Sequence, residues 1–526
     1  MKPSSFIVII ATFLVCRVHL VDAADDKPVK RPKFTVSKET TFITKPLTDD
    51  GFPDYVAAIN ERLGQGVTPE NNAVVMYYRA WGNSEFDRPN PELFKLLGMP
   101  IPADDGQYLV GFTETLKLNF IERDDRYRDM LNQKDQSLDG PWTEKELPEV
   151  AQWLKLNEKP LSFVTAGSKR GQYYSPMFPY AAKREVDARS AALINMNMYE
   201  LGRQREVARM LTSRAMLHLG NGNVDAAWQD LQTCHRIARL VKQGPTAFSV
   251  LVGIVIDAKA NRADLIFLDT VQPCAQQARE YLKQIERLPS LLNVAKQFDF
   301  TERFIFLDST LMIARVGKQE MESFADDLWP KAWSGEINMG EIEWDVVLRN
   351  GNEWFDRFGS ALRTNDRAKM QQKLAQLEEE GKKLASRAKD KKRLTQVFVE
   401  SKSKGAEVAE LMSDILIAGM MTPLCEVPKA VDRAVQRDRN LRIAFALAAF
   451  HADHGQYPKT LGLLKPDCLK QIPNDIFSHK ELNYRRADDG YLLYSIGLNG
   501  KDEAGRSRRY DDPQGDDIRV HMPLAK

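Results

Sequence analysis

His451, Asp453 and His454 come nearest, by residue type and spacing, to a metal site in this chain. Two histidines three residues apart on a helix can bind zinc. Gly455 follows at once, so the pair occupies the last turn of a predicted helix. Histidines at that position complement the exposed backbone carbonyls without a metal. The sequence therefore favours two structural histidines over a zinc site.

Other patterns of catalytic residues are absent from the sequence. There is no HExxH, no GxSxG, no GxxxxGK[ST] and no strand-linked GxGxxG. Residues 401–404 satisfy SxxK, but they lie in a charged stretch where such a match arises by chance. We predict no catalytic residue and no cofactor-binding motif. An exported hydrolase stays open as an alternative, with a site assembled from carboxylates distant in sequence.

The N-terminus has the pattern of a secretory signal. Lys2 precedes an apolar run of about ten residues, and small residues lead up to Ala23. A bilayer needs about twenty apolar residues, so the run is too short to span. We predict that residues 1–23 are cleaved and that no transmembrane segment follows. The mature protein is then exported to the periplasm or the cell envelope.

The balance of charges indicates which kinds of partner the chain can bind, and the cysteines indicate whether disulfides can form. The chain has 74 basic and 73 acidic residues, which argues against nucleic acid as a partner. Its cysteines outside the predicted signal are scattered, without metal-binding spacing. Two disulfides are possible in an exported chain, and buried free thiols are the alternative. These cysteines are Cys234, Cys274, Cys425 and Cys468.

Three regions follow the signal. Residues 24–180 mix short helices and loops; Thr68 reads as the cap of a helix that begins near Pro69. This region holds an aromatic and proline cluster that could line a ligand groove, although core packing is the commoner role of such a cluster. Its members are Trp142, Trp153, Tyr173, Tyr174, Pro176 and Phe178.

The second region, residues 181–430, is predicted to be helical with no sheet up to residue 420, because apolar residues recur at spacings of three and four. Residues 214–240 resemble one tetratricopeptide hairpin, with Ala215 and Ala227 at close-packing positions. No second copy appears at a fixed period, so we expect a helical hairpin within a bundle. Residues 366–411 form a charge-rich amphipathic helix with a short apolar seam. Such helical arrays often bind partner proteins.

The third region, residues 431–526, is predicted to be a small α+β module. A helix over residues 440–455 precedes two strands, 482–486 and 491–497, that flank a turn at Gly490. A third strand covers residues 518–522. The polar loop between the second and third strands is longer than compact domains usually keep without a function. The fold class is therefore mainly α with a C-terminal three-stranded antiparallel sheet.

The stretches HADHGQYP, IPNDIF, NYR, DGYLLYSIGLNGKD and DDI give this module a resemblance to the globular head of the type II secretion major pseudopilin. The resemblance implies that the long loop surrounds a calcium ion. Asn499 and Asp517 match positions of the family's motif, and Asp502 and Asp516 are nearby acids without a firm counterpart. The alternative is a solvated loop whose acids are neutralised by Arg506, Arg508 and Arg509.

The whole chain also resembles a group of large exported bacterial proteins of unassigned function, through TTFITKPLTDDGFPDYVAAINERLGQGVTPENNAV, QWLKLNEKPL and residues 214–240. That resemblance implies shared architecture and export, but no activity. The head follows hundreds of residues without a prepilin motif, so the chain is not expected to be a pilus subunit. We expect a non-catalytic envelope or periplasmic protein, with a helical region that engages a protein partner.

Overall fold

The computed structural model describes residues 32–83, 91–116, 125–178, 192–196, 199–290, 294–316, 342–390, 392, 393, 397, 405–507, 511 and 513–524. The predicted signal, residues 1–23, and the SxxK stretch, residues 401–404, lie outside these ranges.

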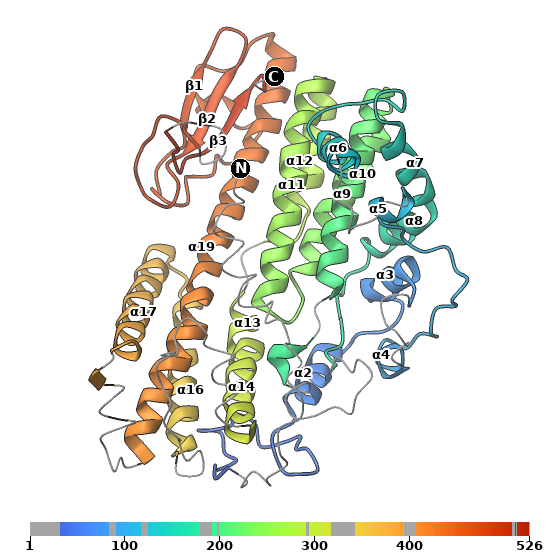
Figure 1. Cartoon of the computed structure of the whole chain (residues 1–526). Coiled ribbons are helices and arrows are strands. Elements are labelled where there is room, and N and C mark those ends of the chain that lie inside the picture. The colour runs from blue at the N-terminus through green and yellow to red at the C-terminus, as the bar shows by residue number, and fades with distance from the viewer. Residues whose placement is uncertain are drawn as a thin grey trace.

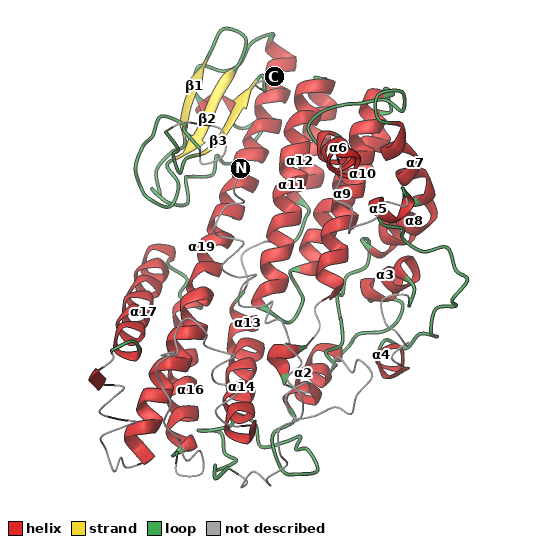
Figure 2. Cartoon of the chain, in the orientation of Figure 1, coloured by secondary structure: helices red, strands yellow, loops and turns green. Residues whose placement is uncertain are grey.

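Figures 1 and 2 show long helices side by side and one small sheet beside the C-terminal end of the longest helix. This arrangement confirms the mainly-α prediction with a C-terminal α+β module. The α-helices are α2 (Tyr55–Gly64), α3 (Ala73–Trp81), α4 (Pro91–Leu96), α5 (Phe112–Thr115), α6 (Asp125–Gln136), α7 (Pro148–Leu156), α8 (Glu158–Gly167), α9 (Tyr199–Gly220), α10 (Val224–Val241), α11 (Ala247–Val271), α12 (Ala275–Glu286), α13 (Ala295–Gln297), α14 (Arg303–Val316), α16 (Trp344–Leu362), α17 (Arg367–Ala388) and α19 (Gly405–His454). Shorter helical turns are η1 (Leu193–Asn195), η2 (Phe298–Glu302) and η5 (Leu461–Leu464), and the strands are β1 (Asn483–Arg486), β2 (Tyr491–Ser495) and β3 (Ile518–Met522).

The predicted hairpin is formed by α9 and α10. Ala215 and Ala227 are both fully buried, which lets the two helices pack closely. Gly222 turns the chain between them at a φ of 76°, a backbone conformation that glycine adopts at no steric cost. Within the described part of residues 181–420 every regular element is helical, as predicted.

The charge-rich helix is α17, and its apolar seam faces α16 and α19. Leu374, Leu377 and Gly381 are buried along it. The helix is shorter than predicted: it ends at Ala388, and most of residues 391–404 lie outside the described ranges. The charged residues of its outer side remain in water, as in a solvated helix face.

The longest element, α19, has 50 residues, and the predicted helix over residues 440–455 is only its last part. The boundary that we predicted between residues 430 and 431 lies inside this helix. Pro423 and Pro428 also lie inside it. Each lacks an amide hydrogen, so the ladder of helical hydrogen bonds is interrupted there.

Both apolar cores of the described chain include part of α19. One core joins α3 and α8 to α12 with the C-terminal part of α19 and the sheet. The other joins α2, α14, α16 and α17 with the N-terminal part. Among the described residues, α19 alone is long and apolar enough to cross a membrane, but 76% of its most apolar stretch is buried inside the protein. A core helix shows such burial.

The start of α3 corrects the prediction for the N-terminal region. Asn72, and not Thr68, caps this helix: its side chain accepts a hydrogen bond from the amide of Val74 at 3.2 Å. Thr68 instead forms a local turn with Asn71, whose Oδ1 accepts from the Thr68 amide at 2.8 Å. A side chain that closes its own turn competes with helix formation.

The sheet has the predicted antiparallel order β1-β2-β3. Tyr491 pairs with Met522, and Leu493 pairs with Val520. These four residues are buried in the core that the sheet shares with α19. The helix α19 ends at His454, one residue before the predicted end, and Gly455 has a left-handed φ of 71°.

Candidate functional site

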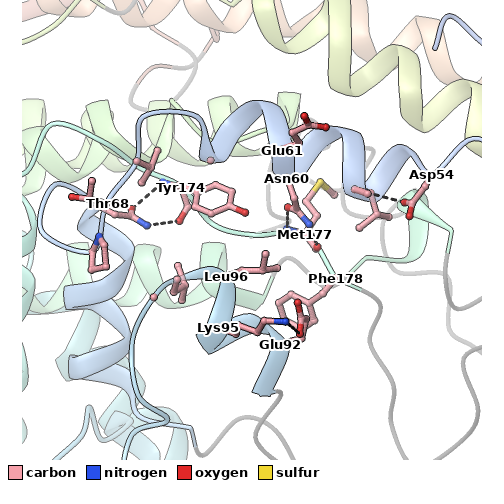
Figure 3. Close-up of a pocket in the computed structure, with 18 residues that line it drawn as sticks. Asp54, Asn60, Glu61, Thr68, Glu92, Lys95, Leu96, Tyr174, Met177 and Phe178 are labelled. Carbon is pink, nitrogen blue, oxygen red and sulfur yellow. Dashed lines mark hydrogen bonds and ion pairs between the residues drawn. The ribbon is translucent and has the colours of Figure 1, made fainter. Parts of the chain in front are cut away.

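A groove lies between α2, α4 and the segment 174–178 (Figure 3). Its volume is about 760 Å³, within the range of about 300–1,000 Å³ that ligand sites occupy. Its described lining residues are Asp54, Val56, Ala57, Asn60, Glu61, Gly64, Val67, Thr68, Pro69, Asn72, Glu92, Lys95, Leu96, Leu97, Gly98, Tyr174, Met177 and Phe178.

Helix α2 supplies one wall because it has two different faces. Tyr55 and Ile59 anchor it in the core, whereas Val56 and Asn60 line the groove. Asp54 fixes the start of the helix, since its carboxylate accepts a hydrogen bond from a first-turn amide at 2.8 Å. Such a cap stabilises a helix by about 1 kcal/mol.

Helix α4 supplies the facing wall. Leu93 and Phe94 bury its inner side, which leaves Leu96 in the groove and 38% exposed. Figure 3 shows Leu96 opposite Tyr174 and Met177. An exposed leucine next to other apolar groups gives a partner a surface from which to displace water.

Two asparagine side chains hold the third wall. Asn72 donates to the carbonyl of Tyr174 at 2.8 Å and accepts from its amide at 2.9 Å. Asn60 does the same for Met177, at 2.6 and 2.7 Å. Since both backbone groups of each residue are bonded, this wall is already formed before any ligand arrives (Figure 3).

The carboxylates of the groove lie apart from one another. Asp54 caps α2, and Glu92 forms an exposed ion pair with Lys95 at 3.4 Å. Figure 3 shows Glu61 on α2, away from Glu92 on α4. Burial raises the pKa of Tyr174 to about 12, so its hydroxyl is neutral at physiological pH. The arrangement suits binding by shape and apolar contact.

Some members of the predicted aromatic and proline cluster line the groove, and others pack in the core. Tyr174 and Phe178 line the groove. Trp142, Trp153 and Tyr173 belong to the core. Sequence reasoning missed α2 and α4 as the other walls, because nothing in their spacing shows that they face this segment.

A second cluster of functional groups is buried where α10, α11 and α19 meet. We call it the ionic network. His235 lies between two carboxylates, with Nδ1 2.8 Å from Asp257 and Nε2 2.7 Å from Asp264. Arg239 also bonds Asp257, and its second nitrogen lies 3.3 Å from Asp438 on α19. All five residues are at most 9% exposed.

The pKa values of these groups are set by burial and by the opposite charges of their neighbours. Burial opposes a charged imidazole, but Asp264 and Asp257 outweigh it and raise the pKa of His235 to about 10. Burial alone would raise the pKa of Asp257, yet Arg239 and His235 hold it below its ordinary value. Burial raises the pKa of Asp264, whose second oxygen has no hydrogen-bond partner in the described structure.

The ionic network was not predicted, because the sequence pattern that indicates it is weak. His235 and Arg239 are one helical turn apart on α10, as are Asp257 and Asn261 on α11. Polar residues at that spacing on a buried face indicate a hydrogen-bonded cluster. Asp438 comes from the opposite end of the chain. Because all five residues are largely buried, we assign the cluster to the packing of α19 and not to a substrate.

The long loop covers the outer face of the sheet. Tyr494 donates to Asp502 at 3.1 Å, and a Cβ at Gly505 would lie 3.0 Å from Leu492. The described part of the loop therefore packs against the strands.

The predicted calcium residues occupy two environments. Asp516 accepts hydrogen bonds from the amides of Leu498 and Asn499 at 2.8 and 3.1 Å. Asp517 accepts from those of Glu503 and Gly505 at 3.2 and 2.7 Å. Both aspartates are buried. Asn499 and Asp502 are exposed.

Glu503 lies beside these residues. Glu503 accepts from the side chain of Asn499 at 2.9 Å and also bonds the amide of Asp516. The second oxygen of Asp517 is buried without a hydrogen-bond partner, and burial raises the pKa of this carboxyl. Within the described residues, no group of three or more His, Cys, Asp or Glu is arranged to hold a metal. Arg506 donates to the carbonyl of Glu503 at 3.1 Å, and Arg508 and Arg509 lie outside the described ranges.

The remaining candidates are structural in the described chain. His454 bonds the carbonyl of Phe450 at 2.9 Å, and His451 stacks on Tyr457. Asp453 forms an ion pair with Arg279. The cysteines Cys234, Cys274, Cys425 and Cys468 are all free thiols.

No family model, no curated protein and no solved structure matches this chain.

Proposed function

We propose that this chain is an exported, non-catalytic protein of the periplasm or cell envelope, whose helical body binds a partner protein through the groove. The preformed groove is the observation that carries the proposal. Much of its lining is apolar, with Leu96 exposed on the α4 wall, and Asn60 and Asn72 fix the third wall in place. A rigid, partly exposed apolar surface reduces the ordering cost of binding.

The charges of the described chain support binding over hydrolysis. A hydrolase built from carboxylates needs two acids that face a substrate across a few ångströms. In the groove, Asp54 is engaged as a helix cap and Glu92 is paired with Lys95. The closest acid–histidine arrangement, around His235, is buried in the ionic network.

Residues 431–526 are proposed to be a pseudopilin-like head that calcium stabilises. The helix followed by three antiparallel strands is the order that the resemblance implies. The buried, unpartnered oxygen of Asp517 gives a cation one ligand, and backbone carbonyls and carboxylates suit calcium. Glu503 is added to Asn499, Asp502, Asp516 and Asp517 as a candidate ligand.

Site-specific cross-linking tests the partner-binding proposal. A photoreactive amino acid replaces Leu96 in the full chain, and a matched variant carries it at Leu156, which is 53% exposed on α7. After irradiation in the native host, we expect a discrete adduct from position 96 that position 156 does not give. The same adducts from both positions, or none from position 96, would contradict the proposal.

Export is tested by the mass of the mature chain. Cleavage after Ala23 follows from the signal pattern, so the mature protein is expected to begin at Ala24. A species that retains Met1 would instead indicate an uncleaved anchor.

A further inference from the structure

We propose that the groove binds a short peptide segment in which a large apolar side chain lies next to a lysine or arginine. This inference rests on the proposed partner-binding function and names the chemistry of the segment that is bound.

The charge of the groove favours a basic ligand. Its described lining includes the carboxylates of Asp54, Glu61 and Glu92, against the single ammonium group of Lys95. Lys95 is already paired with Glu92, and both are largely exposed. Asp54 and Glu61 therefore leave negative charge on the α2 wall, which attracts a cationic side chain and repels an acidic one.

The apolar lining provides the anchor. Leu96 faces Tyr174 and Met177 across the groove, and Val56 and Phe178 extend the same surface. Binding energy at such interfaces comes mainly from one or two large side chains that fill a pocket. A volume of about 760 Å³ accommodates an anchor of this kind.

A peptide fits this geometry better than an enclosed small molecule. The groove is bounded by two helices and by a segment held along its backbone, and it is partly open to solvent. Apolar grooves between helices bind peptide segments by a row of anchoring side chains. The carboxylates of the α2 wall then attract the basic residue that lies next to the anchoring side chain.

The test is selection from a displayed library of random short peptides against the full chain. We expect enrichment of peptides that combine a large apolar residue with a neighbouring Lys or Arg. The variant Ala57→Phe fills the groove from α2 and is expected to lower the affinity of a selected peptide at least about tenfold, since it removes the anchor site. Ala166→Phe, at an exposed alanine of α8 outside the groove, should leave the affinity unchanged.

Charge reversal tests the second half of the proposal. Glu61→Lys is expected to weaken the same peptide by about two- to fivefold, as for a rim charge. Glu144→Lys, at an exposed glutamate outside the groove, serves as its control. Circular dichroism of each variant confirms that the fold is intact.

Selection of acidic or uncharged peptides, or binding that Ala57→Phe leaves intact, would overturn the inference. So would a failure to enrich any peptide. Vesicles of phosphatidylcholine that bind the parent but not Ala57→Phe would assign the groove to lipid instead. If position 96 cross-links a protein while the library gives no basic peptides, partner binding stands and the ligand chemistry proposed here is wrong.

Discussion

The ionic network and the head loop both bury aspartates, but they neutralise them differently. In the network, Asp257 and Asp264 bond the imidazole of His235, and Asp257 also bonds Arg239. In the loop, Asp517 receives its hydrogen bonds from backbone amides. Side-chain cations bring a full charge, whereas amides bring only partial charge. The network therefore contains its own side-chain cations, whereas Asp517 is held by backbone amides and its neighbour Asp516 lies 3.4 Å from Arg433. Asp264 and Asp517 each keep one buried oxygen without a hydrogen-bond partner in the described structure.

This difference predicts where a single substitution harms the protein most. Removing one partner from a buried charge cluster leaves the others uncompensated, which costs about 3–5 kcal/mol. Removing a group whose partners are water or backbone costs less. The four predictions below test this contrast, from the largest expected effect to the smallest.

His235→Ala is expected to lower the free energy of unfolding by about 3–5 kcal/mol, because Asp257 and Asp264 lose their shared partner in a buried site. Chemical denaturation of the full chain measures it. The control is His521→Ala, on the exposed side of β3, which should change stability by less than about 0.5 kcal/mol. Equal effects of the two substitutions would show that the network does not hold α19 in place.

Glu302 is a buried carboxylate that accepts a hydrogen bond from the amide of Ala247 at 2.6 Å. Burial raises its pKa from 4.5 to about 7. The folded state therefore holds the proton more tightly than the unfolded state, so this group's contribution to stability is present below pH 4.5 and is lost as pH rises to about 7.

Glu302→Gln is expected to remove that loss, which amounts to about 3 kcal/mol over the window. Unfolding measured at several pH values tests it. The exposed Glu286 provides a matched control, since Glu286→Gln should keep the pH dependence of the parent. A parent and a Glu302→Gln variant with parallel pH profiles would contradict the prediction.

Calcium is expected to stabilise the full chain by about 2.7 kcal/mol at a hundredfold excess over its dissociation constant. Melting curves with calcium and with chelator measure this. Asp517→Asn keeps the shape and an acceptor oxygen but removes the charge, so its midpoint should respond less to calcium. If the parent melts at the same temperature in both solutions, the loop is held by its own hydrogen bonds alone.

Lys95→Ala should have the smallest effect. Its ion pair with Glu92 spans 3.4 Å between side chains that are 78% and 60% exposed. Exposed pairs of this spacing contribute about 0.3–0.5 kcal/mol. Thermal unfolding should hardly change, while the affinity for a basic peptide should rise. A large loss of stability would mean that α4 depends on this pair.

The sequence predicted features that depend on neighbouring residues. Gly222 and Gly490 fix the turns of the hairpin and of the sheet, and apolar periodicity fixes the helices between them. Features that depend on distant contacts were missed. Arg239 meets Asp438 across 199 residues, and no local pattern relates them.

The groove was predicted in part, for the same reason. The sequence indicated that Tyr174 and Phe178 could line a groove, because aromatic residues cluster around them. The facing residues, such as Leu96, come from other helices. The start of α19 was also missed, because Pro423 and Pro428 normally argue against a continuous helix.

The length of α19 has a mechanical consequence. Fifty residues at about 1.5 Å each make a rod of about 75 Å. Its N-terminal part is packed in the core of α14, α16 and α17, and its C-terminal part in the core that α11 and α12 share with the sheet, so the rod joins the two cores. Its weakest point under load lies at Pro423 and Pro428, where hydrogen bonds are missing. A force or torque on the head would bend the rod there first and leave the two anchored ends rigid.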